Sequence, residues 1–269
     1  MLVSEVMLQQ TPVVRVLPAW REWLERWPAP AALAAEPPGV AVQAWGRLGY
    51  PRRALRLHAA AVAIVERHGG EVPGDHDALL ALPGIGSYTA AAVASFAFGQ
   101  RHAVLDTNVR RVLARAVSGV EYPPPALTVA ETGLARELLP DDAARAARWG
   151  VAVMELGALV CTARAPRCGS CPLARSCRWQ REGTPAYAGP ARRGQAWAGT
   201  DRRVRGLLMA VLRAATGPVT HAALVAAVPP EGLRDPNQRE RCLDALVADG
   251  LVEPLPNNTF TLPGLATAT

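Results

Sequence analysis

Four cysteines, Cys161, Cys168, Cys171 and Cys177, lie within one stretch of 17 residues and constrain the fold of this chain more than any other feature. Their spacing is C-x6-C-x2-C-x5-C. Four thiolates suit either a tetrahedral zinc ion or a [4Fe–4S] cluster. Zinc sites usually pair two short knuckles across a longer gap, whereas these four ligands share one compact loop. The spacing therefore favours the iron–sulfur cluster and leaves zinc as the alternative.

The start of the chain and its apolar stretches indicate a cytoplasmic protein. Met1 is followed directly by Leu-Val-Ser-Glu, without the basic region, apolar core and cleavage site of a signal peptide. The longest apolar stretches, such as 90–98, are too short to span a bilayer. In a reducing cytoplasm, clustered cysteines are expected to bind metal rather than to form disulfides. The fifth cysteine, Cys242, falls on a predicted apolar helix face and is expected to be an ordinary core residue.

The composition indicates a globular protein and is compatible with a polyanionic partner. Half of the residues are hydrophobic and 19% are charged, so the 269 residues can bury a large core. The net charge of +6 fits nucleic acid, although many basic proteins bind none. All 29 residues counted as Lys or Arg are arginines, so the chain has no lysine side chain for Schiff-base chemistry.

Residues 1–180 have an almost wholly helical pattern. Helical periodicity runs over 3–24, and shorter helices are predicted around 40–47, 52–68, 76–81 and 89–98. Three tryptophans at helical spacing, Trp20, Trp23 and Trp27, are expected to lie in the core. Residues 181–200 lose the periodicity and gain Gly, Pro and Ala, which predicts a linker.

The segment 201–269 has a different pattern. Amphipathic helices are predicted over 202–215, 220–228 and 238–249, and a hairpin is predicted around the P-N-N turn at 256–258. Three helices and a hairpin suggest a small winged-helix-like module. Such a module binds DNA in some proteins and is a structural or protein-contact cap in others, and the sequence leaves both roles open.

Two glycines interrupt the helical pattern in L-P-G-I-G-S-Y-T-A, residues 82–90. A helix ends there, a tight turn follows and a new helix starts near Ser87. Gly84 and Gly86 permit a close backbone approach, and the amides at the start of the second helix can bind a phosphate. An ordinary turn without a ligand is the alternative.

Two carboxylates stand in motifs that suit chemistry. Asp106 and Asn108 lie at the mouth of a predicted helix in V-L-D-T-N-V-R-R-V, where a local N-cap is the alternative to a chemical role. Glu5 lies among apolar residues in S-E-V-M-L-Q-Q-T. A carboxyl in such surroundings can donate a proton, and a solvated glutamate at a helix start is the alternative.

Together and in this order, these motifs resemble those of the endonuclease III/MutY superfamily of helix-hairpin-helix DNA glycosylases, over roughly residues 1–180. Lyases of the endonuclease III type carry a lysine two residues after the second hairpin glycine, where this chain has Tyr88. Tyrosine at that position, the S-E-V-M-L-Q-Q-T segment and L-G-Y-P-R-R-A at 48–54 are similar to MutY-type adenine DNA glycosylases. The resemblance implies a monofunctional enzyme that excises adenine opposite 8-oxoguanine or guanine.

The resemblance also implies a fold and an organisation into domains. We expect an all-α, two-lobed glycosylase, with a six-helix barrel carrying the hairpin over 1–103 and a [4Fe–4S] domain over 104–180. The linker at 181–200 and the winged-helix-like module at 201–269 follow. The expected partner is double-stranded DNA with a mispaired adenine, bound by a monomer at the bacterial nucleoid.

The resemblance implies a role for each matching residue. Glu5 would protonate adenine and Asp106 would stabilise the charge left on the sugar, while Tyr88 and Asn108 hold the site in place. The residues expected to contact DNA are Gln10, Leu48, Tyr50, Gly84, Gly86 and Ser87.

Three departures from the family pattern bear on the substrate. The family usually has some thirty residues before this segment, so we expect a start that is annotated too late or a truncated chain. Val151 stands where family members often place Glu or Gln facing adenine. The segment 201–269 looks too short for the Nudix-like domain that reads 8-oxoguanine in many MutY proteins. The alternatives are a mismatch thymine or uracil glycosylase of the same superfamily and a non-catalytic iron–sulfur DNA-binding protein.

Overall fold

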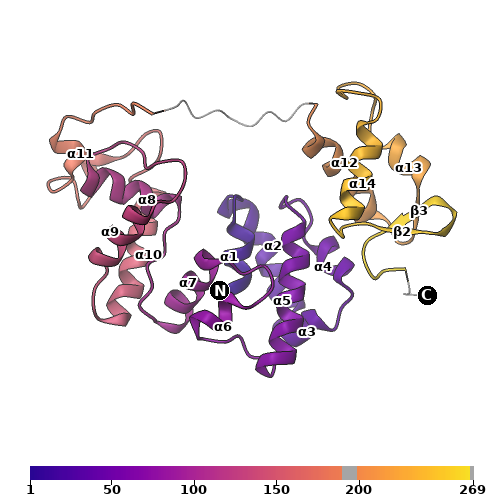
Figure 1. Cartoon of the computed structure of the whole chain (residues 1–269), viewed down its shortest axis with the longest axis horizontal. Helices are drawn as coiled ribbons and strands as arrows, with labels where there is room; N and C mark the ends of the chain where they lie inside the picture. Colours follow the sequence, from indigo (N-terminus) through magenta and orange to yellow (C-terminus); the bar gives the residue numbers. More distant parts are fainter. Residues whose placement is uncertain (190–198, 267–269) are drawn as a thin grey trace. The chain divides into compact units, whose positions relative to one another are not determined.

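The computed structural model describes residues 1–189 and 199–266, which form two compact units (Figure 1). The first, called here the tryptophan unit, contains residues 2–73, 82–84 and the described residues from 199 onward. The second, the cysteine unit, contains Met1, residues 74–81 and the described residues from 85 to 189. The expected domain boundaries at 103 and 180 stay predictions. Residues 190–198 of the predicted linker lie outside the described residues.

The tryptophan unit begins with five helices around an aromatic core. They are α1 (Leu2–Leu8), α2 (Val13–Arg26), α3 (Pro30–Ala34), α4 (Pro38–Ala44) and α5 (Arg52–His68). Trp23 is buried and meets the rings of Trp27 and Trp45 edge-on, with centroids 4.8 Å and 5.4 Å away. Trp23 and Trp27 therefore lie in the core as predicted, and Trp20 is half-buried.

The predicted continuous helix over 3–24 is wrong, because the chain breaks between α1 and α2. Gln10 adopts a left-handed φ of 56°, and Pro12 is the N-cap of α2. Proline lacks the amide hydrogen that a continuing helix would need. The break creates a short loop, Gln9–Pro12, between the two helices.

The C-terminal part of the tryptophan unit is a module of three helices and a small sheet. Its elements are α12 (Asp201–Ala214), β1 (Val219–Thr220), α13 (His221–Ala226), α14 (Gln238–Ala248), β2 (Glu253–Leu255), η3 (Pro256–Asn258) and β3 (Thr259–Thr261). The strands are antiparallel in the order β1-β3-β2, with Phe260 paired to both Val219 and Pro254. The predicted helices and hairpin are confirmed, and β1 is an addition. Cys242 is buried in α14, as expected for a core residue.

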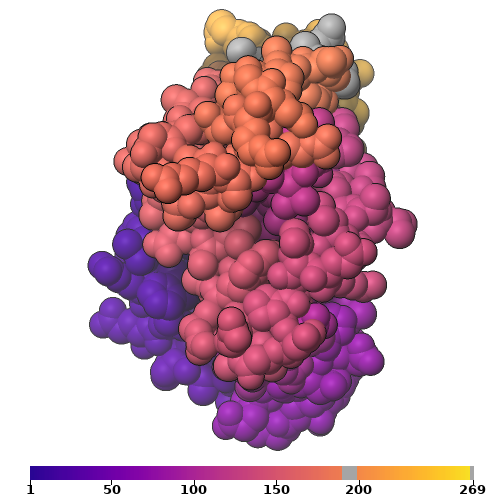
Figure 2. Space-filling model, turned by 90° about the vertical axis from the view of Figure 1, so that its left-hand side faces the viewer, coloured from indigo at the N-terminus to yellow at the C-terminus, as the bar shows by residue number. Residues whose placement is uncertain are grey.

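The cysteine unit is helical throughout its described elements. They are α6 (His76–Leu80), α7 (Ser87–Phe98), α8 (Thr107–Leu113), the π-helical turn η1 (Ala114–Ser118), α9 (Val129–Leu138), α10 (Ala143–Leu159), η2 (Cys168–Ser170) and α11 (Arg178–Arg181). Small side chains let two helices approach closely: a Cβ atom added to Gly157 of α10 would lie 2.7 Å from the Asn108 carbonyl of α8. Figure 2 shows the orange segment that ends the unit beside the pink segment that contains α10.

None of the helices in the described residues is both long and apolar enough to cross a membrane.

Candidate active site and metal centre

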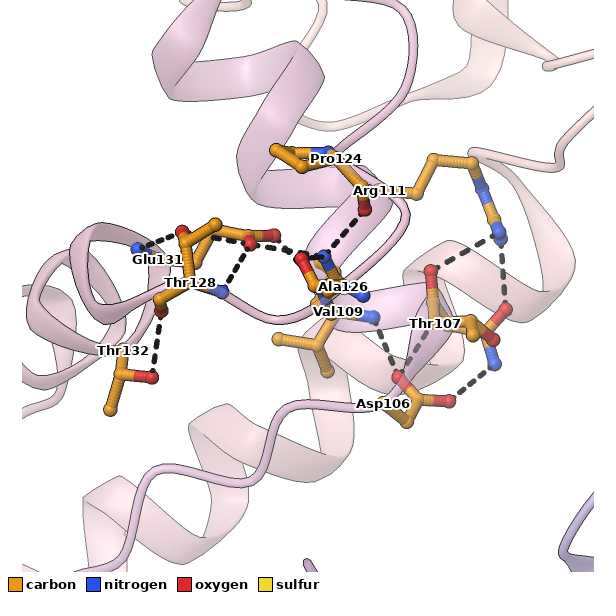
Figure 3. Close-up of polar contacts among 11 residues, drawn as sticks. Asp106, Thr107, Val109, Arg111, Pro124, Ala126, Thr128, Glu131 and Thr132 are labelled. Atoms are coloured by element: carbon orange, nitrogen blue, oxygen red, sulfur yellow. Dashed lines mark hydrogen bonds and ion pairs between the residues drawn. The ribbon is translucent and has the colours of Figure 1, made fainter. Parts of the chain in front are cut away.

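Asp106 is fixed at the start of α8 by three hydrogen bonds (Figure 3). Its Oδ1 accepts from the backbone amides of Asn108 at 2.8 Å and Val109 at 2.7 Å. Its Oδ2 accepts from Asn108 Nδ2 at 2.7 Å. A carboxylate oxygen has two acceptor lone pairs, so Oδ2 keeps capacity for a further partner. Asp106 is therefore the N-cap of α8, and its chemical role stays a prediction for a carboxylate that these hydrogen bonds orient.

Asn108 is held in turn by the buried Arg111. Arg111 Nη2 donates to Asn108 Oδ1 at 2.8 Å and to the Gly157 carbonyl of α10 at 2.6 Å. Its Nε donates to the Cys161 carbonyl at 2.7 Å. Because the amide oxygen is held by arginine, the amide nitrogen of Asn108 points at Asp106. A continuous chain of hydrogen bonds thus connects the carboxylate with the first cysteine of the loop.

The far side of α8 is tied to α9 by an ion pair. Arg110 Nε donates to Glu131 Oε1 at 2.8 Å, and Thr128 completes a capping box with Glu131 (Figure 3). Burial raises the pKa of Glu131, but the hydrogen bonds from Arg110 and Thr128 outweigh it and hold the pKa below its usual range. These contacts fix the helix that carries Asp106.

The four cysteines of the loop line one small pocket, together with Arg115 and Gln180. All five cysteines are free of disulfide bonds. Burial raises the pKa of the Cys168 thiol, and the other three cysteines of the loop raise it further, as expected for thiols that share a site. Among the described residues, no group of three or more His, Cys, Asp or Glu is arranged to hold a single metal ion; a cluster differs, because its four cysteine ligands each bind a different iron atom.

Donors that stabilise thiolate sulfur surround this pocket. Arg115 is 2% exposed and directs Nη1 at Cys161 Sγ, 3.4 Å away. Gln180 Nε2 lies 3.0 Å from Cys168 Sγ. Hydrogen bonds to the sulfurs are a usual part of iron–sulfur sites. Four converging thiols with cationic and amide donors therefore fit a cluster with four cysteine ligands.

Arg115 also supports the loop as a whole. It donates to the carbonyls of Thr162 at 2.8 Å and Ala163 at 3.1 Å, and its guanidinium lies 4.8 Å from the Trp179 ring. It belongs to η1, and π-helical turns are often found at functional sites. The loop is therefore held from inside by one buried arginine.

The hairpin between α6 and α7 contains the close backbone approach that its glycines predict, and the phosphate contact stays a prediction. Gly84 has a φ of +75°, and a Cβ atom there would lie 2.5 Å from Arg56 Cβ, so only glycine fits. Gly86 is the N-cap of α7 and provides no side-chain cap. Both glycines and Ser87 are exposed, and Tyr88 is half-buried in the first turn of α7.

The remaining predicted site residues lie in the tryptophan unit. Glu5 is 8% exposed on α1. Gln10 and Tyr50 are exposed and have left-handed φ angles of 56° and 49°. Leu48 is buried, and its carbonyl accepts from Thr11 Oγ1 at 3.1 Å. Glu5 thus belongs to the tryptophan unit and Asp106 to the cysteine unit.

One residue that sequence reasoning missed, Arg53, holds both loops of the tryptophan unit. Its guanidinium donates to carbonyls on either side, including Gln9 O at 2.7 Å and Gly49 O at 3.0 Å. Sequence reasoning missed Arg53, and also Arg111 and Arg115, because arginine is usually exposed. The available signal was their spacing of four residues, which places Arg111 and Arg115 on one helix face.

The cysteine unit also has an open apolar groove, which Asp106 does not line. It runs along α8, α10 and α11 and is lined by residues such as Leu113, Trp149, Leu156 and Leu159. Val151, the position expected to face adenine, is exposed on α10 and does not line it.

Two family models match the chain, one over the N-terminal helices and one over the cysteine loop. Residues 3–131 match the HhH-GPD superfamily of base excision DNA repair proteins, and residues 161–177 match the iron–sulfur binding domain of endonuclease III. The adenine DNA glycosylase of Mycolicibacterium smegmatis is 53% identical over 98% of this chain and 87% of its own length. The human adenine DNA glycosylase is 44% identical over 65% of this chain and 32% of its own length.

Solved structures are similar to about two thirds of the chain. A thermostable thymine-DNA glycosylase is 27% identical with a TM-score of 0.58, over 67% of this chain and 83% of that one. A non-covalent endonuclease III–DNA complex gives the same identity and TM-score, over 68% and 83%. The all-α helix-hairpin-helix fold and the [4Fe–4S] cofactor expected from the sequence are confirmed. The chain belongs to the adenine DNA glycosylases of the HhH-GPD superfamily.

Proposed function

We propose that this protein hydrolyses the N-glycosidic bond of adenine mispaired with 8-oxoguanine or guanine in duplex DNA, acting as a monomer at the bacterial nucleoid. The observation that carries the proposal is the Asp106 carboxylate, oriented by three hydrogen bonds at the start of α8. It stands in a chain that is 53% identical to an adenine DNA glycosylase over nearly its full length.

Two carboxylates divide the chemistry. The adenine must leave the base stack before a side chain can reach its glycosidic bond. Glu5 then donates a proton to the adenine ring, so that the base departs as a neutral leaving group, and accepts a proton from the attacking water. The sugar becomes positively charged as the bond breaks, and the fixed negative charge of Asp106 stabilises it. Tyr88 and Asn108 hold the reacting groups in place.

The reaction stops at base release and does not cut the strand. A β-lyase of the endonuclease III type forms a Schiff base with a lysine, and this chain has none. The product is therefore an abasic site in an intact strand.

DNA is held by the exposed loops. The amides at the start of α7, after Gly84 and Gly86, bind a backbone phosphate. Gln10 and Tyr50 contact the duplex next to the flipped base, and their left-handed backbones suit a functional role because such strain persists where the surroundings fix it. Leu48 anchors the loop that carries Tyr50, since its side chain is buried and its carbonyl accepts from Thr11 Oγ1.

The cluster is held by Cys161, Cys168, Cys171 and Cys177, with Arg115 and Gln180 donating toward the sulfurs. A bound cluster would link the two ends of the cysteine loop to each other. Arg111 connects this loop to Asn108 and so keeps the Asp106 carboxylate oriented.

The proposal is tested by single-turnover base release with cluster-loaded protein. Duplexes pair adenine with 8-oxoguanine, guanine or cytosine, and a T·G duplex is included. We expect adenine release opposite 8-oxoguanine and guanine, with strand cleavage only after alkali. Release of thymine alone would instead identify a thymine glycosylase. Tight binding with no release from any duplex would identify a non-catalytic DNA-binding protein.

A further inference from the structure

The exposed ring of Tyr50 is contacted by an arginine from the C-terminal module. Tyr50 is 40% exposed, and its ring centroid lies 5.1 Å from Cζ of Arg202, in the first turn of α12. Cζ of Arg53 lies 5.7 Å from the centroid of the same ring. Cations over an aromatic face are attracted by its quadrupole. The module therefore contributes a cation to the loop that carries Tyr50.

Backbone contacts hold the module in this position. The Gly39 amide at α4 donates to the Pro263 carbonyl at 2.8 Å, and a Cβ atom on Gly39 would approach that oxygen to 2.6 Å. Gly264 lies directly against Pro37 and Pro38. The packing of the module on α4 therefore fixes the position of Arg202 beside Tyr50.

An ion-pair network near Tyr50 strengthens the same contact. Asp249, at the end of α14, pairs with Arg52 at 3.1 Å and also with Arg205 of α12. One carboxylate thus joins the first residue of α5 to the C-terminal module. Arg202 lies one helical turn before Arg205 on α12, so this carboxylate also fixes the helix that carries Arg202.

Positive charges meet across the contact between module and helices. Burial lowers the pKa of Arg213 near the end of α12, and the nearby Arg47 lowers it further. Arg47 and Arg202 are both exposed. Arg213 and Arg47 repel one another, and a bound polyanion relieves this repulsion. An arginine-rich surface with an exposed aromatic ring is typical of nucleic-acid binding.

We infer that the C-terminal module is part of the DNA-binding surface, and that Arg202 contacts a backbone phosphate beside the nucleotide that Tyr50 contacts. The inference rests on the proposed DNA substrate. In this role the module holds DNA through a charge contact with the backbone. Such a contact does not depend on the base sequence. A protein partner for the same surface is the competing assignment.

The test compares Arg202→Gln with a matched control, Arg67→Gln. Arg67 is exposed on the last turn of α5, roughly 22 Å along the helix from Arg52. Both variants lose one positive charge. Affinity for an adenine·8-oxoguanine duplex carrying a non-hydrolysable adenosine analogue is measured over a range of salt concentrations, and melting temperatures confirm that both variants fold.

We expect Arg202→Gln to bind roughly tenfold more weakly, with the slope of log K against log salt reduced by about one, as for loss of one phosphate contact. The loss should be equal opposite 8-oxoguanine, guanine and cytosine, and Arg202→Lys should restore most of the slope. Arg67→Gln should bind like the unmodified protein.

Unchanged affinity and slope in Arg202→Gln would overturn the inference and favour a protein partner. A loss confined to 8-oxoguanine duplexes would also overturn it, because a phosphate contact does not read the opposite base. The proposed function is tested separately by adenine release from the unmodified protein. Binding that depends on Arg202 in a protein that releases no adenine would leave the inference standing and refute the enzyme.

Discussion

Replacing Arg53 by methionine should destabilise the tryptophan unit strongly and disorder both loops that we assign to DNA contact. Arg53 is 6% exposed. Its Nη1 donates to the carbonyls of Val6 at 2.8 Å, Met7 at 2.9 Å and Gln9 at 2.7 Å. Its Nη2 donates to Thr11 Oγ1 at 2.9 Å and to the Gly49 carbonyl at 3.0 Å. Burial lowers the pKa of the guanidinium to about 10, so it is charged at neutral pH.

The magnitude follows from what the substitution leaves behind. Hydrogen bonds to a charged donor contribute about 1.5–3 kcal/mol each, but the five are not additive, because burial of the guanidinium costs several kcal/mol. Methionine keeps an unbranched apolar stem and provides no donor, so the carbonyls of both loops lose their partner. We expect a net loss of about 3–5 kcal/mol, similar to breaking a buried charged contact. For a unit of this size that corresponds to a melting temperature lower by roughly 6–20 °C.

The assay is thermal unfolding followed by circular dichroism, with Arg52→Met as the control. Arg52 is the neighbouring residue and makes a half-exposed ion pair with Asp249, so its loss should cost less than about 1 kcal/mol. Arg53→Lys keeps the charge with fewer donors and should fall between the two. If Arg53→Met melts within about 3 °C of the unmodified protein, the guanidinium does not hold the two loops together and the reasoning is refuted.

Three further predictions concern other contacts. Arg111→Gln should slow adenine release at least roughly tenfold in single turnover without unfolding the protein, because Asn108 loses the contact that orients it; an unchanged rate would contradict this. Glu131→Gln should lower the free energy of unfolding at pH 7 by about 1–2 kcal/mol through loss of the Arg110 pair and the helix cap. Since the folded-state pKa of Glu131 lies below its usual 4.5, this stability is present above pH 4.5 and is lost as the pH falls through the folded value, so denaturation curves of the two proteins should converge in acid. Gly39→Val should loosen the C-terminal module at a cost of about 1–3 kcal/mol, detected as faster proteolysis between the module and the helices.

The sequence predicted the elements whose signals are local. Helix α5 was expected over 52–68 and occupies Arg52–His68, because Pro51 precedes its apolar spacing and Gly69 ends it. The hairpin of the C-terminal module was also expected, since its turn residues P-N-N are a local signal. The small strand β1 was missed, because two residues have no periodicity of their own.

Non-local contacts explain what the sequence could not predict. The break between α1 and α2 depends on Arg53, which takes up carbonyls from the end of α1 and lies more than forty residues away. Pro12 was a local sign of the break, but helical periodicity on both sides of it favoured one continuous helix. The buried arginines Arg111 and Arg115 were likewise invisible, because their roles depend on carbonyls and sulfur supplied by the cysteine loop. Asp106 was predicted from its motif, yet the orientation of its carboxylate is set by Asn108 and Arg111 together.

The central claim, that two carboxylates divide the work of adenine excision, is tested most directly by single-turnover adenine release from an adenine·8-oxoguanine duplex by the unmodified protein, Glu5→Gln and Asp106→Asn. Binding of the same duplex is measured in parallel, so that a loss of rate is separated from a loss of affinity. We predict that both variants bind the duplex and that each releases adenine at least about a hundredfold more slowly. Near-native release by both variants would contradict the account.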